Sequence, residues 1–292
     1  MRWGQFTAGF AFTFLVPEFG DNIAFTTTSS DGASFENVSP TQFNYGLKVA
    51  PRIWLEYTLA DGLGARASYW QFNHAAATAI GTAPANGFGQ ITTPTFGDID
   101  ISTIIPGSTM TANSGLELQA LDLEGTKGVS FGRWSLAASA GVRYGAIKQN
   151  YSAQQRSANG VLNGSIDFQH NFEGAGPTFG LEARRYLAER FSIFSTARGS
   201  LLFGNLRSTL QGGEDLDLST PFITSSNNRR LDTLPVANMQ LGADWQIPLG
   251  TAATFFWQGA MEAQWWQGVG SAATETGDLG LFGFNTAVGI AW

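Results

Sequence analysis

The chain contains no cysteine, which excludes disulfide bonds and thiolate metal sites. It has only two histidines, His74 and His170, which leave little for a metal cluster. Its formal net charge of −7 argues against nucleic acid as a partner. We therefore expect no metal, no cofactor and no nucleic-acid partner.

Long apolar runs are also missing: no stretch of about 18 apolar residues could form a membrane-spanning helix. Charged residues make up only 13%, about half the usual share, while glycine (36) and phenylalanine (23) are abundant. This combination favours a transmembrane β-barrel over a soluble core, with a secreted β-sandwich or β-helix as the alternative. No basic segment followed by an apolar core opens the chain, so we expect a mature or truncated form of an exported protein.

The last stretch, LFGFNTAVGIAW (281–292), alternates between a bulky apolar face and a small one. As a soluble edge strand it would be sticky, whereas in a barrel it closes the sheet onto the first strand. An alternating final strand that ends in an aromatic residue resembles the insertion signal of bacterial outer-membrane barrels. That resemblance implies the barrel-assembly machinery as a partner and assigns the signal to Phe284, Val288, Ile290 and Trp292.

Alternation at period two predicts ten strands, at 5–14, 43–59, 63–74, 116–124, 133–150, 164–186, 191–210, 236–247, 251–267 and 281–292. Pro17 is expected to end the first, a bulge is predicted near Ala120, and 174–177 is expected to break the sixth. If Leu59 pairs with Leu63 across the turn, Glu56 lies opposite Arg66.

The connections alternate between long and short, with long loops at 16–42, 75–114, 151–162, 211–233 and 268–279. This order is typical of outer-membrane barrels, with long external loops, short periplasmic turns and both termini periplasmic. We predict that residues 1–292 form one domain: an all-β, transmembrane, antiparallel up-and-down barrel of about ten strands, with eight to twelve compatible. Trp134, Tyr57, Phe191 and Trp292 at one end, and Tyr45, Tyr151 and Trp265 at the other, are expected to form two aromatic belts.

Charged residues recur on the polar face of the strands, and charge on the lipid face would be destabilising. The predicted interior set is Lys48, Arg52, Glu56, Arg66, Glu117, Asp122, Glu124, Arg143, Glu182, Arg184, Arg198, Asp244 and Glu262. Two interpretations stay open: paired charges that plug a narrow barrel, or charges that line a water-filled pore. Because side chains nearly fill barrels of about eight strands, we expect a narrow pore at most.

Catalytic chemistry has little support. His74 ends its strand and Asp98 and Asp100 follow in the next loop, but no spacing holds them together, and we predict no enzyme. Glu214, Asp215 and Asp217 do not match a calcium-loop spacing and are interpreted as a negative vestibule. The predicted loops hold twelve acids: Glu18, Asp21, Asp31, Glu36, Asp98, Asp100, Glu214, Asp215, Asp217, Asp232, Glu275 and Asp278. Only Arg156, Arg207, Arg229 and Arg230 oppose them, which predicts weak cation preference.

Three segments, APRIWLEYTLADGLGARASYWQFNH (50–74), LELQALDLEGTK (116–127) and SAGVRYGAI (139–147), resemble the Legionella-type major outer-membrane protein family. The resemblance implies a general diffusion pore or an abundant structural barrel of the outer membrane, and transfers no catalytic residue. We therefore expect a porin-like channel for small hydrophilic solutes or ions, with a closed structural or surface-interaction barrel and a rim enzyme as alternatives. Expected partners are outer-membrane lipid and lipopolysaccharide, and a homo-oligomer is compatible with the sequence.

Overall fold

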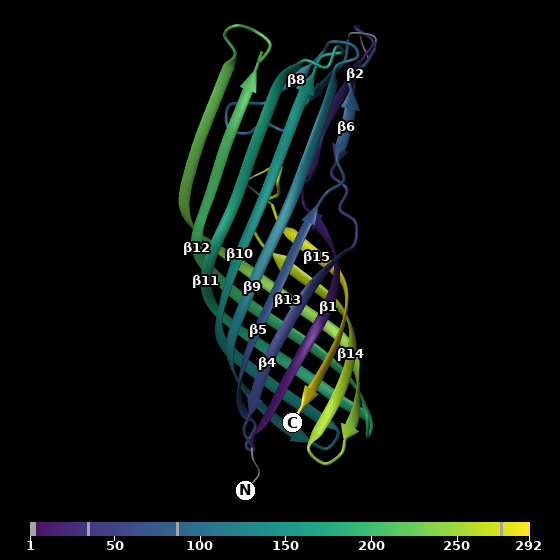
Figure 1. Cartoon of the computed structure of the whole chain (residues 1–292), viewed down its shortest axis with the longest axis vertical. Helices are drawn as coiled ribbons and strands as arrows, with labels where there is room; N and C mark the ends of the chain where they lie inside the picture. Colours follow the sequence, from purple (N-terminus) through teal and green to yellow (C-terminus); the bar gives the residue numbers. More distant parts are fainter. Residues whose placement is uncertain (1–3, 34–35, 86–87, 275–276) are drawn as a thin grey trace.

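The computed structural model describes residues 4–33, 36–85, 88–274 and 277–292. Antiparallel strands dominate it (Figure 1). Among these residues there is no helix that is long and apolar enough to cross a membrane.

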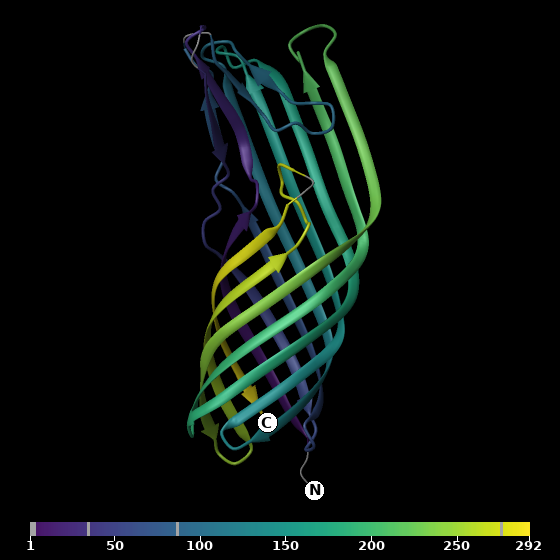
Figure 2. The same cartoon turned by 180° about the vertical axis from the view of Figure 1, so that it is seen from behind.

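Ten strands close into an antiparallel up-and-down barrel, as predicted (Figures 1 and 2). In ring order they are β1 (Gln5–Phe19), β4 (Lys48–Thr58), β5 (Leu63–Ala75), β9 (Thr109–Phe131), β10 (Trp134–Arg156), β11 (Leu162–Ala188), β12 (Phe191–Glu214), β13 (Phe222–Leu249), β14 (Ala253–Trp266) and β15 (Leu279–Ala291). Short turns join strands at one end, which we call the turn end, and longer connections join them at the other, the loop end.

The last strand closes the ring against the first. β15 pairs with β1 over thirteen residue pairs, from Thr7↔Ala291 to Phe19↔Leu279. Phe6 and Trp292 exchange backbone hydrogen bonds of 2.9 Å at the turn end, which seals the seam. Pro17 does not end β1, because the strand continues beside β15 to Phe19.

The direction of polarity reverses along the long strands, which run to 23–28 residues in β9 to β13. In the half of the barrel nearer the turn end, the turn half, Asp122 and Glu124 point inward and Leu121 and Leu123 outward. In the loop half the same strand buries Leu116 and Leu118 inside and turns Glu117 outward. The register stays continuous throughout, so the predicted bulge near Ala120 is wrong. The polar residues of β9 change face because the outer surface of the strand changes from apolar in the turn half to polar in the loop half.

An apolar core fills the loop half. A separate sheet of β3 (Glu36–Gln42), β2 (Ile23–Ser30), β7 (Gln90–Thr92) and β8 (Ser102–Thr103) lies there, and β6 (Ala79–Thr82) pairs beside β9 (Figure 1). The apolar core includes Phe25, Phe72, Ile91, Phe96 and Tyr151. Segments 16–42 and 75–114, predicted as loops, therefore contain strands, because their apolar residues pack inside the barrel wall.

Two of the remaining long connections are shorter than predicted, while the β14–β15 connection agrees with the predicted 268–279 to within a residue at each end. Most of 151–162 and 211–233 belongs to the extended β10–β11 and β12–β13 hairpins, because polar residues there cover strands that face water. β13 pairs with β14 only from Val236 onward, so Phe222–Leu234 forms a free edge that stands off the barrel (Figure 2). The β11–β12 register is the same on both sides of 176–177, so the predicted break at 174–177 is wrong.

The two predicted aromatic belts have different outcomes. Tyr57, Trp134 and Trp292 are exposed on the outer wall at the turn end, and Phe191 lies there beside Trp245. At the other end Trp265 is exposed, but Tyr45 and Tyr151 are buried inside, so their assignment to a belt is wrong. Tyr151 has inward parity on β10, and Tyr45 packs into the same apolar core from the segment between β3 and β4.

Candidate functional site: the charged interior

Two acids on β9 organise the interior of the turn half. Asp122 and Glu124, two residues apart on the inward face, are both buried. Arg143, directly opposite Asp122 on β10, binds it through two hydrogen bonds of 2.6 and 2.9 Å. Arg66, directly opposite Glu124 on β5, binds it at 3.1 and 2.9 Å. Each acid is thus held by an arginine from a neighbouring strand, one on either side of β9.

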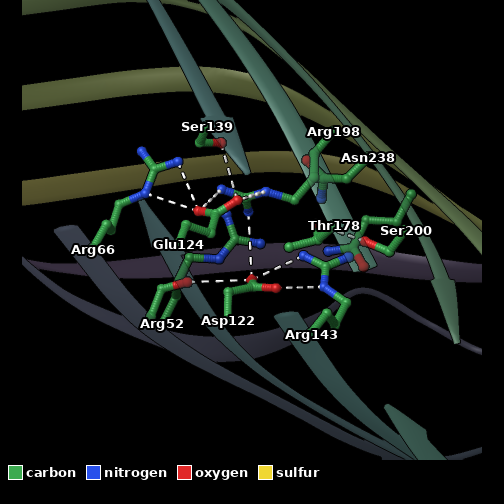
Figure 3. Close-up of polar contacts among 12 residues, drawn as sticks. Arg52, Arg66, Asp122, Glu124, Ser139, Arg143, Thr178, Arg198, Ser200 and Asn238 are labelled. Carbon is green, nitrogen blue, oxygen red and sulfur yellow. Dashed lines mark hydrogen bonds and ion pairs between the residues drawn. The ribbon is translucent and has the colours of Figure 1, made fainter. Parts of the chain in front are cut away.

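Arg198 connects these two pairs from a distant strand. It belongs to β12, which β10 and β11 separate from β9, yet it reaches Glu124 at 2.8 and 3.1 Å and Asp122 at 3.5 Å (Figure 3). Gly180 lies directly opposite Arg198, and a Cβ there would meet Ser139 Oγ at 2.5 Å. Because residue 180 has no side chain, Arg198 runs along the inner face of β11 beside Ser139 to reach Glu124.

A second hub surrounds Glu262 on β14, whose side chain is fully buried. Arg52, from β4 across the β15–β1 seam, binds both carboxylate oxygens, at 2.5 and 3.1 Å. Four amide side chains also donate to the carboxylate at 2.8–3.2 Å: Asn238, Gln240, Gln264 and Asn285. Fully satisfied buried acids of this kind hold strands in a fixed arrangement.

A third cluster lies nearer the turn end. Arg184 bridges Asp244 at 2.6 Å and Glu182 at 3.0 Å. Asp244 also accepts hydrogen bonds from Ser192 and Gln246. Together the three clusters place every inward arginine of the turn half, from Arg52 to Arg198, in at least one ion pair. The pairing expected under the first of the two interpretations is therefore present, but a cavity remains among the clusters.

Glu56 is the exception among the inward acids. It lies directly opposite Arg66, which confirms the predicted register, but the ion pair of Arg66 is with Glu124. Within the described part of the chain Glu56 makes no ion pair, and it accepts hydrogen bonds from Thr58 and Thr126 at 3.5 and 3.4 Å. Its side chain lines a cavity inside the barrel.

That cavity measures about 530 Å³ and runs among the three clusters. Its lining is mainly polar, with Gln5, Thr7 and Gln258 beside the charged groups. Trp70 and Trp266, both nearly fully buried, lie on its lining and belong to the apolar core. The indole N–H of Trp70 has no hydrogen-bond partner among the described residues. The polar cavity therefore ends where the apolar core begins.

Two predicted interior residues differ from the rest. Glu117 faces outward, opposite Lys148 on β10, so its assignment to the lumen is wrong, because the strand has already left the turn half there. Lys48 has inward parity but is exposed at the end of β4. The others, from Arg52 to Glu262, face the interior: Glu56, Arg66, Asp122, Glu124, Arg143, Glu182, Arg184, Arg198 and Asp244.

The predicted vestibule and rim residues lie at the loop end. Glu214 ends β12, and its pKa is raised by partial burial and by the charges of Asp100 and Asp215. The Nε2 of His74 donates to Gly46 O, 2.8 Å away, and partial burial lowers the pKa of the imidazole. No carboxylate lies within ion-pair distance of His74 among the described residues. Asp217 is in the β12–β13 connection, and Glu275 lies outside the described residues.

The insertion residues and the amides had different sequence signals. Phe284, Val288, Ile290 and Trp292 are exposed on the outer wall, and Phe284 stacks on Phe14 with ring centroids 4.7 Å apart.

Sequence reasoning missed the amides around Glu262, although Asn238, Gln240 and Gln264 share its inward parity. Shared parity was the available signal, but it does not show to which acid a neutral amide donates its hydrogen bond.

Comparison with known proteins identifies the family. The profile of the family described as Legionella pneumophila major outer membrane protein precursor matches residues 3–290, nearly the whole chain. The protein belongs to this family. It is accordingly an outer-membrane protein, and its barrel spans that membrane with the apolar outer wall of the turn half. No curated protein matches the chain at a significant level.

The chain also matches solved outer-membrane proteins at low sequence identity. The Escherichia coli outer membrane protease OmpT is 13% identical, with a TM-score of 0.43 over 99% of this chain and 96% of that one. The outer membrane protein OprG of Pseudomonas aeruginosa is 10% identical, with a TM-score of 0.36 over 98% and 96%. The toluene transporter TodX of Pseudomonas putida is 8% identical, with a TM-score of 0.28 over 100% and 89%.

Proposed function

We propose that this protein is a narrow outer-membrane channel for passive diffusion of small hydrophilic solutes or ions. The observation that carries the proposal is the polar cavity of about 530 Å³ inside the membrane-spanning half, lined by charged and amide side chains. A barrel that served only as a wall would gain nothing from a wet interior. The ion pairs across the cavity narrow the path, so the conductance should be small.

A closed structural or surface-interaction barrel is the second candidate. It is favoured by the apolar core of the loop half, where residues such as Phe72, Phe96 and Tyr151 fill the interior. Under the channel proposal, solutes cross only when this core shifts. Under the closed-barrel proposal, it stays packed and the outer surface carries the function.

Conductance in planar bilayers separates the two candidates. Wild-type protein should give small, discrete current steps, and Arg198→Ser should enlarge them, because removing the side chain that links Asp122 with Glu124 widens the cavity. Arg133→Ser, at an exposed turn, is the matched control and should conduct like wild type. Absence of steps from both folded wild type and folded Arg198→Ser would reject the channel in favour of the closed barrel.

The proposed orientation places the short turns in the periplasm and the loop end outside the cell. With this orientation the acids near the external mouth, Glu214, Asp215 and Asp217 among them, attract cations within a Debye length of roughly 8 Å. The interior is mixed in sign and should select less. Reversal potentials under a salt gradient should show a weak cation preference that fades as salt rises, whereas clear anion preference would refute the vestibule.

A further inference from the structure

Three basic side chains lie on one row across the outer face of the long strands. Lys148 of β10 is directly opposite Asn171 of β11, Asn171 is opposite Arg207 of β12, and Arg207 is opposite Arg229 of β13. Neighbouring strands are about 4.8 Å apart, so the row spans three strand spacings. Lys148, Arg207 and Arg229 are all exposed on the outward face, and we call them the basic row.

The two arginines of the basic row repel each other. Like charges directly opposite in a ladder are destabilising, and Arg207 and Arg229 occupy such a pair. Neither forms an ion pair with a carboxylate in the part of the chain that the structure describes. The Nε of Arg229 donates to Asn205 at 3.1 Å. Of the nearby outward acids, Glu173 accepts from Tyr144 at 2.6 Å. Glu117 lies directly opposite Lys148, so Lys148 has an acidic neighbour that the two arginines lack.

The row lies just beyond the apolar band of the outer wall. Four residues nearer the turn end, Tyr144 of β10 and Phe203 of β12 face outward and are exposed. Two residues nearer the loop end, the outward residues of β10, β12 and β13 are polar: Asn150, Thr209 and Asn227. With about 3.3 Å of rise per residue, the basic row is within reach of the headgroup layer that borders the hydrocarbon.

We propose that the basic row binds the phosphate groups of a phosphorylated glycolipid of the outer leaflet, the chemistry of lipopolysaccharide. A phosphate between Arg207 and Arg229 would accept hydrogen bonds from two planar guanidinium groups and cancel their repulsion. Lys148 lies two strands from Arg207 with Glu117 directly opposite, so the two arginines carry the site and Lys148 adds a weaker attraction at its edge. The inference rests on the proposed orientation, because this glycolipid faces the loop end only if that end is outside.

The test measures binding of purified lipopolysaccharide to the full chain folded in detergent, with a chelator present so that divalent ions do not bridge phosphates. The double variant Arg207→Gln/Arg229→Gln should bind about tenfold or more weakly. The control Arg133→Gln/Arg190→Gln removes the same charge from exposed turns at the other end and should bind like wild type. Dephosphorylated lipopolysaccharide should bind wild type no better than the double variant binds the intact lipid.

Several outcomes would overturn the proposal. They are unchanged binding by the double variant, an equal loss in the control, or equal binding of dephosphorylated lipid. Another such outcome is complete displacement of the lipopolysaccharide by inorganic pyrophosphate at an equal concentration. That result would make the basic row an anion site without lipid selectivity, and it would overturn the proposal. Conductance of the same double variant is recorded alongside. Loss of lipid binding with wild-type conductance supports the site, and absence of conductance in all variants would refute the channel while leaving the binding result intact.

Discussion

At the scale of single residues, the interior depends on buried charges whose partners come from distant strands. Glu262 accepts from an arginine and four amides, and each of those donors would be left unsatisfied without it. Removing one member of a buried ion pair leaves the other charge uncompensated. The hub is therefore more sensitive to truncation than its small share of the chain suggests.

Glu262→Ala should lower the free energy of unfolding by about 3–5 kcal/mol, because Arg52 loses its only carboxylate among the described contacts. Urea titration of the folded, heat-modifiable form is the measurement. Glu117→Ala removes an outward acid of the same chemistry and should change stability by no more than about 0.5 kcal/mol. Equal effects of the two substitutions would contradict the assignment of Glu262 to a structural hub.

Buried tyrosines predict an alkaline limit to stability. Burial raises the pKa of Tyr45 to about 12, against the opposing hydrogen bond with Ser114. Burial also raises the pKa of Tyr151, which donates to Ala24 O at 2.7 Å. Free phenols titrate near pH 10.

Between about pH 10 and pH 12 the unfolded chain has lost phenolic protons that the folded chain keeps, so unfolding releases protons and stability falls as pH rises. Replacing both residues, Tyr45→Phe/Tyr151→Phe, should flatten that part of the stability profile. Tyr57→Phe, on the outer wall, is the control and should keep the wild-type slope. A double variant that still loses stability as steeply as wild type would show that other groups set the alkaline limit.

At the scale of elements, β15 decides whether the ring closes. Its outward residues face lipid, where an arginine near the midplane costs about 2–4 kcal/mol. Phe284→Arg/Val288→Arg should therefore abolish the membrane-inserted, heat-modifiable form. Ile223→Arg, an exposed outward position on the free edge of β13, faces water and should insert normally. Normal insertion of the β15 variant would argue against a lipid-facing closing strand.

The strands also show how far sequence patterns reach. Period-two alternation and the order of turns predicted ten strands and the Glu56–Arg66 register, because both are local properties. Alternation does not state which face is inside. Leu116 and Asp122 both point inward, so a strand that crosses from membrane to water imitates a bulge when polarity alone is followed. The stretch 225–230 is polar on both faces because it is a free edge, and it therefore looked like a loop.

Contacts between distant strands were beyond the sequence. Parity predicted that Arg198 and Glu124 face inward, but their contact runs over the inner face of β11 past Gly180, which has no side chain in the way. The same holds for Arg52 and Glu262, which meet across the seam between the two ends of the chain. Such pairs follow from the curvature of the closed ring, which no local pattern records.

At the scale of the whole molecule, two halves with opposite polarity share the same continuous strands. The turn half has an apolar exterior around charged clusters, and the loop half has a polar exterior around an apolar core. The loop half thus resembles a water-soluble protein in its packing, while the turn half is solvated by lipid. The same strands therefore run from a lipid-facing exterior to a water-facing one.

This inversion sets the shape of the particle once it is extracted. Detergent coats only the apolar wall, so its ring should encircle the turn half and leave the loop half bare. Small-angle neutron scattering, with the detergent matched and then unmatched to the solvent, should place the centres of mass of ring and protein well apart along the long axis. Coincident centres would mean that detergent also covers the loop half. A displaced ring would leave the loop half uncovered for antibodies and lattice contacts, so crystals of this protein should grow through one end of the molecule.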